Sequence, residues 1–477
     1  MNLIKSFVKF SFGSWVAAVI SFFTTPIITL LLVPEEFGRA ATFAFTNALL
    51  LQVVLAGGDQ GFMRFFYEKD IKDRPALLWN SLLPSFFVWM ILSSSILFFW
   101  KPVSQWLIAD EQFVIAVLLS INLFLVLLDR YAFLVVRMQQ KGTIFSLLRI
   151  LTSILNAIFI IVYCRYVSKS FYAIIAASMF SLTITIIISV FVEHRFWFSK
   201  TAITKKEIIQ VLKYGIPFAP ACLMSILFES LDKVFLRTYR GFEEMGLYSA
   251  AYKIVALLAI VQVGFSMFWT PVSFEHYEKH PDDTSLYEKT YRYLLVILTI
   301  LGLLLIGCKD LIILIFAKGY RNAASLMPFL IFIPVLYTLT EITCLGIYFK
   351  KKSVWQLIVF GILVVVSFSL NILLVPLFGA KGAALVVALS YTAYFFLRTY
   401  VSIRLYPMKF HLGKTMLTFA MLYIVAGLNT FVANKIVGIS CAVVALLVYS
   451  LFHISTVKDM FIYIRNLINM KMIESNR

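Results

Sequence analysis

The sequence predicts an all-α integral membrane protein of about fourteen transmembrane helices, arranged as two parallel six-helix bundles around a central cavity plus two C-terminal helices. Three observations support this fold class. Of 477 residues, 61% are hydrophobic and only 14% are charged, which is more apolar than a soluble domain can bury. The apolar runs have the length of membrane-spanning helices rather than of short alternating barrel strands. A Glu-Glu-x-Gly motif also occurs twice, in similar surroundings.

The first predicted span is a retained helix at 10–33. The N-terminus, MNLIKSFVKF, carries two lysines before an apolar stretch that is too long for the core of a signal peptide. The other spans are predicted at 40–57, 76–99, 113–136, 143–163, 168–192, 213–236, 246–271, 291–308, 325–349, 354–376, 382–403, 414–432 and 436–454.

Basic residues indicate how these spans are oriented. If the N-terminus is cytoplasmic, most lysines and arginines fall in inward segments, as the positive-inside rule requires. The net charge of +18 therefore reflects membrane orientation and does not indicate a nucleic-acid partner, since the longest basic run is the three lysines 350–352. The loops are short and leave no room for a soluble catalytic domain.

Motifs for enzymatic chemistry are missing from the sequence. We identify no nucleophile, metal or nucleotide motif, so we expect no catalytic residue, no cofactor, no metal site and no enzymatic activity. The cysteines lie in or at the ends of apolar segments without CxxC spacing, which indicates neither a disulfide framework nor a zinc site. They are Cys164, Cys222, Cys308, Cys344 and Cys441.

The repeated motif divides the chain. PEEFG at 34–38 and FEEMG at 242–246 each follow the first helix of a six-helix block, and VKFSFG at 8–13 is weakly echoed by LKYGIP at 212–217. Because six is even, both blocks begin in the cytoplasm, which predicts parallel repeats about an axis along the membrane normal. We expect bundles at 1–205 and 206–405, with two extra helices and a basic tail at 406–477.

Within the motif, Gly38 and Gly246 suit a tight turn or a helix entry, and the glutamates suit helix N-termini, where the dipole favours negative charge. We favour this structural interpretation. The alternative is a direct substrate role for the glutamates, which are Glu35, Glu36, Glu243 and Glu244.

Residues 212–254, LKYGIPFAPACLMSILFESLDKVFLRTYRGFEEMGLYSAAYKI, resemble the seventh-helix signature of Wzx-type polysaccharide flippases for O-antigen and capsule repeat units. These belong to the superfamily that also contains the MATE multidrug exporters and the lipid II flippases. Further similarity lies in PEEFG, in RMQQKGTIFSLLRI from Arg137 and in NILLVPLFGAKGAALVVALSY from Asn371. The resemblance covers roughly residues 1–405.

This resemblance implies an undecaprenyl-pyrophosphate-linked oligosaccharide as substrate, flipped outward across a bacterial inner membrane by alternating access, with both termini cytoplasmic. The implied partners are that lipid-linked sugar, membrane lipids, a polysaccharide polymerase and glycosyltransferases. The first span, 10–33, has no charged residue, whereas lipid II flippases are expected to carry an Arg-Asp pattern near it. This difference favours the polysaccharide branch.

Charged residues inside spans are costly, and each needs a partner, a wet cavity or a route to the interface. An anionic head group needs cations, and the guanidinium fork binds phosphate oxygens bidentately. We therefore predict a pyrophosphate site in the cytoplasmic half. The alternatives are snorkelling to the interface and simple pairing, including pairing of Arg130 with Asp129. The candidates are Arg64, Arg130, Arg149 and Arg398.

In the outer half, Glu229 and Lys233 lie on one helix face at i and i+4. Lys233 and Lys253 are candidates for guiding the head group outward, with neutralisation of Lys233 by Glu229 as the alternative. A proton carried by a buried carboxylate is a further hypothesis, because burial favours the neutral form. The candidates for that role are Glu229, Asp232 and Glu341.

The last two helices suit either a groove for the polyprenyl tail, as the resemblance to lipid II flippases implies, or a packing role. The segment after them, 457–477, is predicted to be an amphipathic basic tail on the cytoplasmic face.

Rival functions fit the sequence less well. A drug exporter of the same superfamily binds amphipathic cations, so it should favour acidic cavities over arginines. A membrane glycan polymerase or ligase usually needs a long outward catalytic loop, and the sequence has none. A lipid II-type flippase stays an alternative within the same superfamily, disfavoured by the uncharged first span.

Overall fold

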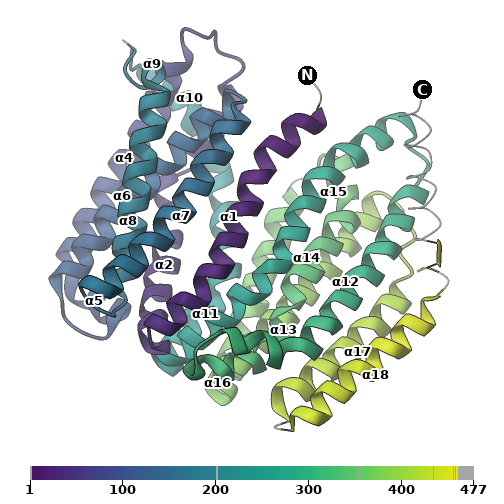
Figure 1. Ribbon diagram of the computed structural model, residues 1–477. Coiled ribbons are helices and arrows are strands. Elements are labelled where there is room, and N and C mark those ends of the chain that lie inside the picture. The colour runs from purple at the N-terminus through teal and green to yellow at the C-terminus, as the bar shows by residue number, and fades with distance from the viewer. Residues whose placement is uncertain are drawn as a thin grey trace, which may run out of the picture. The chain divides into compact units, whose positions relative to one another are not determined.

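The computed structural model describes residues 3–199, 202–352, 354–432, 434–454, 456, 458 and 459, and every regular element within them is a helix (Figure 1). This confirms the predicted all-helical class. The basic tail predicted at 457–477 falls almost entirely outside the described residues. The chain forms two compact units, Met1–Lys253 and Ile254–Arg477. The bundle boundaries at 205 and 405 stay predictions.

The first unit is built from ten helices, a 3-10 turn and the beginning of a long helix. They are α1 Leu3–Leu31, α2 Pro34–Leu55, α3 Gly58–Phe65, α4 Arg74–Phe98, α5 Trp100–Ile108, α6 Phe113–Met138, α7 Gly142–Tyr166, α8 Tyr172–Val192, α9 His194–Trp197, α10 Lys205–Gly215, η1 Ile216–Phe218 and the start of α11 Ala219–Lys279.

The second unit contains the end of α11 and the remaining helices. They are α12 Ser285–Ile312, η2 Ile313–Ile315, η3 Lys318–Ser325, α13 Met327–Leu330, α14 Phe332–Thr343, α15 Leu345–Phe349, α16 Val354–Leu405, α17 Leu412–Phe431 and α18 Lys435–Phe452. Here α14 packs against α16, and α12 packs against α14, α17 and α18.

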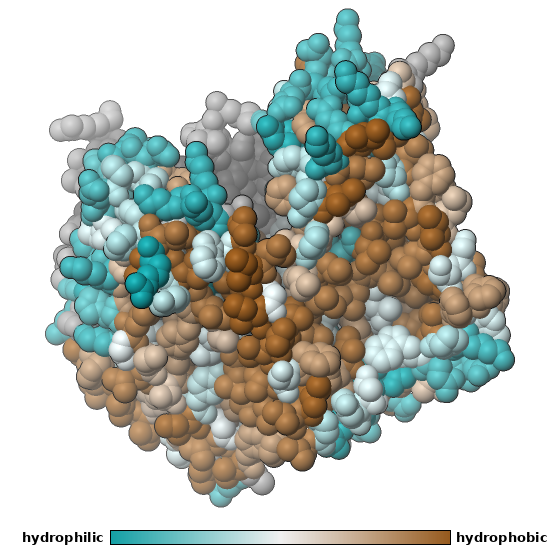
Figure 2. Space-filling view, turned by 180° about the vertical axis from the view of Figure 1, so that it is seen from behind, coloured by the Kyte–Doolittle hydropathy of each residue, from teal (hydrophilic) through white to brown (hydrophobic). Residues whose placement is uncertain are grey.

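The helices have the length and composition of membrane spans. Among the described residues, 11 helices are long and apolar enough to cross a membrane, or up to 12 if the bent pair Lys318–Ser325 and Met327–Thr343 counts as one span. Many of their apolar side chains face outward, as lipid contact requires, and Figure 2 shows hydrophobic residues covering much of one face. The protein is therefore a multi-pass membrane protein.

All the predicted span ranges fall on helical segments, but two of the qualifying helices each hold two ranges. Gly241 breaks α11 with φ 79°, and Gly379 breaks α16 with φ 57°. Such left-handed conformations are open to glycine at little steric cost. The structure does not confirm the predicted count of fourteen crossings. Each of these two long helices is counted as one candidate span, although each holds two of the predicted ranges.

The motif glycines lie within helices, so their predicted tight turns were wrong. Gly38 lies near the start of α2 and Gly246 in α11 shortly after the break at Gly241, and neither has a positive φ. The predicted helix entry is confirmed for the first copy, because Glu35 and Glu36 occupy the first turn of α2 after Val33, the N-cap residue.

The core of the first unit joins the end of α2 to α3, α4 and α6. Phe62, Leu78 and Tyr131 are fully buried in it. The Tyr131 hydroxyl donates to the Ser81 carbonyl at 2.9 Å, so its polar end is satisfied inside the core.

A second set of polar contacts attaches α10 to this core. Asn80 of α4 donates to the Glu207 carboxylate at 2.6 Å and accepts from the Thr204 backbone N–H at 3.0 Å. Lys69 pairs with the same carboxylate. The Thr204 hydroxyl in turn caps α10 by accepting from the Glu207 N–H. These contacts hold the first turn of α10 against α4 and the loop before it.

Candidate head-group site

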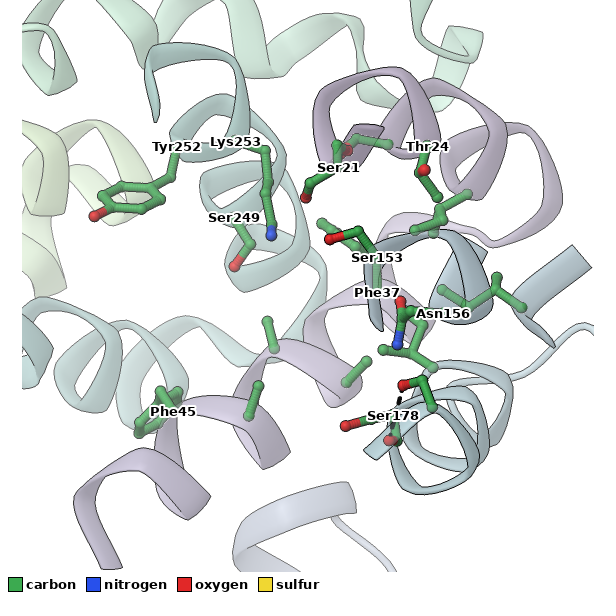
Figure 3. Close-up of a pocket in the computed structure, with 18 of the residues that line it drawn as sticks. Ser21, Thr24, Phe37, Phe45, Ser153, Asn156, Ser178, Ser249, Tyr252 and Lys253 are labelled. Carbon is green, nitrogen blue, oxygen red and sulfur yellow. Dashed lines mark hydrogen bonds between the residues drawn. The ribbon is translucent and has the colours of Figure 1, made fainter. Parts of the chain in front are cut away.

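The first unit contains a cavity of about 430 Å³ lined by α1, α2, α7, α8 and α11 (Figure 3). Small side chains of α2, Ala40, Ala41 and Ala44, leave space along one wall. Phe37, Phe45 and Ile28 supply apolar surface. The cavity is thus formed by helices that are distant in sequence.

Hydroxyl and amide groups make up most of its polar lining. They come from α1, α7, α8 and α11, and the residues are Ser21, Thr24, Thr25, Thr152, Ser153, Asn156, Ser178, Ser181, Tyr248 and Ser249. Several of these hydroxyls donate to a carbonyl one helical turn earlier, as Thr25 does to Ser21 at 2.8 Å. Their oxygens still have acceptor capacity toward the cavity. Such a lining suits a ligand rich in hydroxyl groups.

Lys253 supplies a cation to this cavity. Its amine faces Ser21 and Ser153 across the space in Figure 3, while the Tyr252 ring turns away. The Lys253 side chain makes no hydrogen bond or ion pair with any residue that the structure describes. An unpaired ammonium group in a membrane-embedded cavity favours an anionic ligand.

Lys233, the second cation, is already engaged. Its amine donates to the Glu229 backbone carbonyl at 2.6 Å and lies 3.7 Å from the Asp232 carboxylate. It also lies 5.5 Å from the centre of the Tyr252 ring. Asp232 is buried and accepts a hydrogen bond from Tyr248. The ion pair therefore joins Lys233 to Asp232, whereas the helical spacing alone indicated the Glu229 carboxylate.

Glu229 belongs to the same group of charges on α11. Its carboxylate lies within electrostatic range of Lys233 and Asp232, but Glu229 is an exposed residue, so the burial expected for it as a proton carrier is wrong. Glu229 and Lys233, which helical spacing places on one face, are thus joined by Asp232 in one group of charges. Lys253 lines the same cavity as Lys233.

The predicted arginines are distributed over separate environments. Arg130 of α6 pairs with the buried Asp59 of α3 at 2.7 Å. Its predicted alternative partner, Asp129, lies within electrostatic range of both Arg130 and Arg149. Arg149 also stacks over the Phe133 ring at 4.0 Å. Arg130 and Arg149 are therefore brought into one neighbourhood.

Arg64 lies outside the candidate spans. It is on the short helix α3, where it pairs with Glu68 at 2.5 Å, and both side chains are about half exposed. This is the geometry of an interfacial i,i+4 pair, which contributes little to stability.

Arg398 and Glu341 belong to the second unit. Arg398 is buried on α16 and donates to the hydroxyls of Tyr394 and Tyr348, the latter at 3.0 Å. Glu341 of α14 hydrogen-bonds Tyr337 and lies within electrostatic range of Arg398. These residues form a polar cluster among apolar helices.

The hydroxyl lining is the part of the site that the sequence analysis did not identify. A usable signal was present in the spacing of polar residues within apolar spans. Thr152, Ser153 and Asn156 lie within about one turn of α7, and Ser178 and Ser181 lie three apart on α8. Such clusters predict a polar stripe, but not which helices share it.

The arrangement of helices defines a known class of membrane transporter fold. A solved structure described as the lipid II flippase MurJ in an inward closed conformation superposes with a TM-score of 0.69 at 16% identity, covering 94% of this chain and 99% of that one. An inward-facing MATE-family multidrug resistance transporter of the MOP superfamily superposes with a TM-score of 0.60 at 14% identity. The match covers 85% of this chain and 98% of that one. At these identities the likeness concerns the fold.

A third solved structure, a MOP superfamily transporter from Pyrococcus furiosus, superposes with a TM-score of 0.52 at 16% identity. The match covers 85% of this chain and 96% of that one. Residues 3–276 match the family described as polysaccharide biosynthesis protein, and the chain belongs to that family. A comparison with curated protein sequences finds no match.

Proposed function

We propose that the protein flips undecaprenyl-pyrophosphate-linked oligosaccharide repeat units from the cytoplasmic to the outer leaflet by alternating access, for surface polysaccharide synthesis. The observation that carries this proposal is the cavity of the first unit, where hydroxyl and amide groups surround the unpaired Lys253. Sugars are recognised through hydroxyl and amide hydrogen bonds, and a pyrophosphate requires cations. Membership of the polysaccharide biosynthesis family supports the same substrate class.

The proposed location is the bacterial inner membrane, with both termini in the cytoplasm. In this proposal Lys233 and Lys253 contact the head group. Arg64, Arg130, Arg149 and Arg398 form the cytoplasmic-side route, and Glu229, Asp232 and Glu341 are the candidates for ion coupling. A polymerase and glycosyltransferases that act on the same lipid-linked sugar are the proposed partners.

Two alternatives use the same fold. A lipid II-type flippase is supported by the superposition on MurJ. A drug exporter for amphipathic cations is disfavoured by Lys253, because an ammonium group in the cavity repels a cation.

The test is a leaflet assay in the native host, with the gene deleted and then restored. Polyprenyl-pyrophosphate lipids are extracted, and an impermeant glycan-labelling reagent reports which leaflet holds the completed repeat unit. We expect completed units to accumulate on the cytoplasmic leaflet after deletion and to move outward on restoration. Units that already face outward would contradict the proposal and indicate a polymerase or ligase.

Two further outcomes separate the alternatives. Cytoplasmic accumulation of lipid II instead of repeat units would indicate the lipid II reaction. Unchanged lipid-linked glycans, together with greater sensitivity to cationic drugs, would indicate the drug exporter.

A further inference from the structure

The second unit contains a separate cavity of about 510 Å³, lined by residues of α12, η2, η3, α16, α17 and α18. It lies between the end of α12, η3, the restart of α16 after Gly379, and the neighbouring ends of α17 and α18, which are the yellow helices in Figure 1. All of its lining residues belong to the second unit. The proposed transport reaction does not use it.

Positive charge is concentrated in this cavity. Its ionisable lining residues are Lys309, Arg321, Lys381 and Lys435, with Asp310 as the single carboxylate. The Asp310 carboxylate lies 2.6 Å from the Lys309 amine and 3.9 Å from the Lys435 amine. One carboxylate cannot balance four cations, and like charges in so small a space repel one another.

Two of these cations occupy unfavourable positions for a lysine. Lys435 is the first residue of α18, and that helix has no acidic residue in its first turn. Lys381 lies two residues after the break at Gly379, where the second half of α16 begins. A helix N-terminus carries partial positive charge, so a lysine there is favourable only when an anion is also present.

Buried polar groups in the same cavity point to the same conclusion. Thr430 is 2% exposed, and its hydroxyl has no hydrogen-bond partner in the described part of the chain. The Lys309 side chain is 7% exposed. A buried hydroxyl without a partner costs about 1–3 kcal/mol of free energy, which a ligand that accepts a hydrogen bond from it would recover.

Part of the cavity lining is apolar and exposed. Leu314, Phe431 and Val432 belong to it and are 55%, 43% and 41% exposed. Cations and hydroxyl donors beside exposed apolar side chains match a phosphate group at the boundary between water and hydrocarbon. A phosphate offers several acceptor oxygens, which arginine and lysine donors can meet together.

We propose that this cavity is a binding site for a phosphate anion, either the phosphate head group of a lipid or a free phosphate. Arg321, Lys381 and Lys435 contact the phosphate oxygens, and the Thr430 hydroxyl donates to one of them. In the proposed membrane orientation, the site opens toward the outer leaflet.

The experiment uses the purified full-length protein in a neutral detergent and three probes. Dioctanoyl phosphatidic acid carries a phosphate head group, dioctanoylglycerol has the same acyl chains without phosphate, and inorganic phosphate lacks the chains. Binding is measured by native mass spectrometry for the lipids and by calorimetry for inorganic phosphate. Binding of phosphatidic acid alone assigns a lipid head group, and binding of inorganic phosphate as well assigns the free anion as a ligand.

The matched variants are Arg321→Gln and Lys381→Gln, which remove cavity charges, and Lys318→Gln. Lys318 lies on the same 3-10 segment as Arg321 but does not line the cavity. We expect each cavity variant to weaken binding about tenfold, the value of one charge-assisted hydrogen bond, and Lys318→Gln to bind as the wild type does. Thr430→Val, which keeps the charge, should also weaken binding.

Three results would overturn the proposal. They are a failure of both phosphate probes to bind, equal binding of dioctanoylglycerol and phosphatidic acid, and wild-type affinity in Arg321→Gln and Lys381→Gln. Thermal unfolding of each variant shows whether a loss of binding reflects a loss of fold.

Discussion

Gly38 of α2 and Gly246 of α11 contact each other's helices reciprocally. A Cβ atom added to Gly38 would lie 1.8 Å from the Phe242 carbonyl oxygen, and one added to Gly246 would lie 1.8 Å from the Pro34 carbonyl oxygen. Phe242 precedes Gly246 by four residues, and Pro34 precedes Gly38 by four. The two copies of the motif therefore pack on each other through bare backbone, as small residues allow in membrane helices.

Substituting either glycine should open this crossing. In Gly38→Ala or Gly246→Ala, the methyl group meets main-chain atoms, which cannot move aside as a flexible side chain can. We expect a loss of about 1–3 kcal/mol or more in the free energy of unfolding, seen as a lower midpoint of thermal unfolding in detergent.

Gly427→Ala is the matched control, because a Cβ atom there meets nothing within 4 Å. That variant should match or exceed wild-type stability, since alanine is the better helix former. Equal midpoints for Gly38→Ala and Gly427→Ala would contradict the close crossing.

The two glutamates of the first motif should differ in importance. Glu36 accepts from the Phe171 backbone N–H at 2.7 Å and pairs with Arg39 at 2.7 Å, with its side chain 16% exposed. Glu35 pairs with the same arginine, but its side chain is 54% exposed. Glu36→Gln should lower the free energy of unfolding by about 1–2 kcal/mol, and Glu35→Gln by about 0–1 kcal/mol.

Chemical denaturation in mixed micelles measures both variants. The order of the two effects is the critical result. A larger loss of unfolding free energy in Glu35→Gln than in Glu36→Gln would contradict this order. The hydrogen bond from the Phe171 N–H to Glu36 would then not be the main contact that stabilises the start of α2. A large loss of transport at wild-type stability in either variant would instead favour the substrate role considered for these glutamates.

The helices and the class of the protein could be predicted from the sequence because hydrophobic run length is a local property. Apolar stretches of suitable length lie on helices throughout the described chain. The repeated Glu-Glu-x-Gly motif could also be identified in the sequence, because its residue types recur in the same order. Its glycines fit a tight turn and a helix entry equally well in the sequence, and only the crossing of α2 with α11 shows the close contact that they make.

The candidate site was less predictable because its contacts join distant parts of the chain. Arg130 and Asp59 are 71 residues apart, whereas the sequence neighbour Asp129 was the visible alternative. For Lys233, helical spacing predicted the Glu229 carboxylate, but the amine reaches the Glu229 carbonyl and Asp232 instead. Side-chain conformation decides between such neighbours, and periodicity carries no information about it.

Removing the cavity cation should impair transport with little effect on stability. In Lys253→Gln the ammonium group is lost without breaking a hydrogen bond or ion pair within the described residues. Loss of one charge-assisted contact to a pyrophosphate should lower the rate of flipping about tenfold or more, measured in vesicles with the lipid-linked repeat unit.

Lys279→Gln is the control on the same helix, because Lys279 is exposed and pairs with Glu275 at 2.5 Å. It should flip at the wild-type rate. Wild-type flipping by Lys253→Gln would remove that lysine from the site.

A double substitution separates pairing from substrate binding at Arg130. Asp59 has a side chain that is 5% exposed, and Arg130, 2.7 Å away, has one that is 40% exposed. Arg130→Gln leaves a buried carboxylate without its partner, so it should cost about 3–5 kcal/mol of stability. Asp59→Asn together with Arg130→Gln removes both charges and should recover most of that loss.

Thermal unfolding measures the stability of the single and double variants, and the vesicle flipping assay measures their transport. If Arg130 only neutralises Asp59, flipping recovers along with stability. Because we propose that the exposed part of its guanidinium group also meets the pyrophosphate, we expect the double variant to be stable but slow, and a stable double variant with wild-type flipping would leave Arg130 a structural residue.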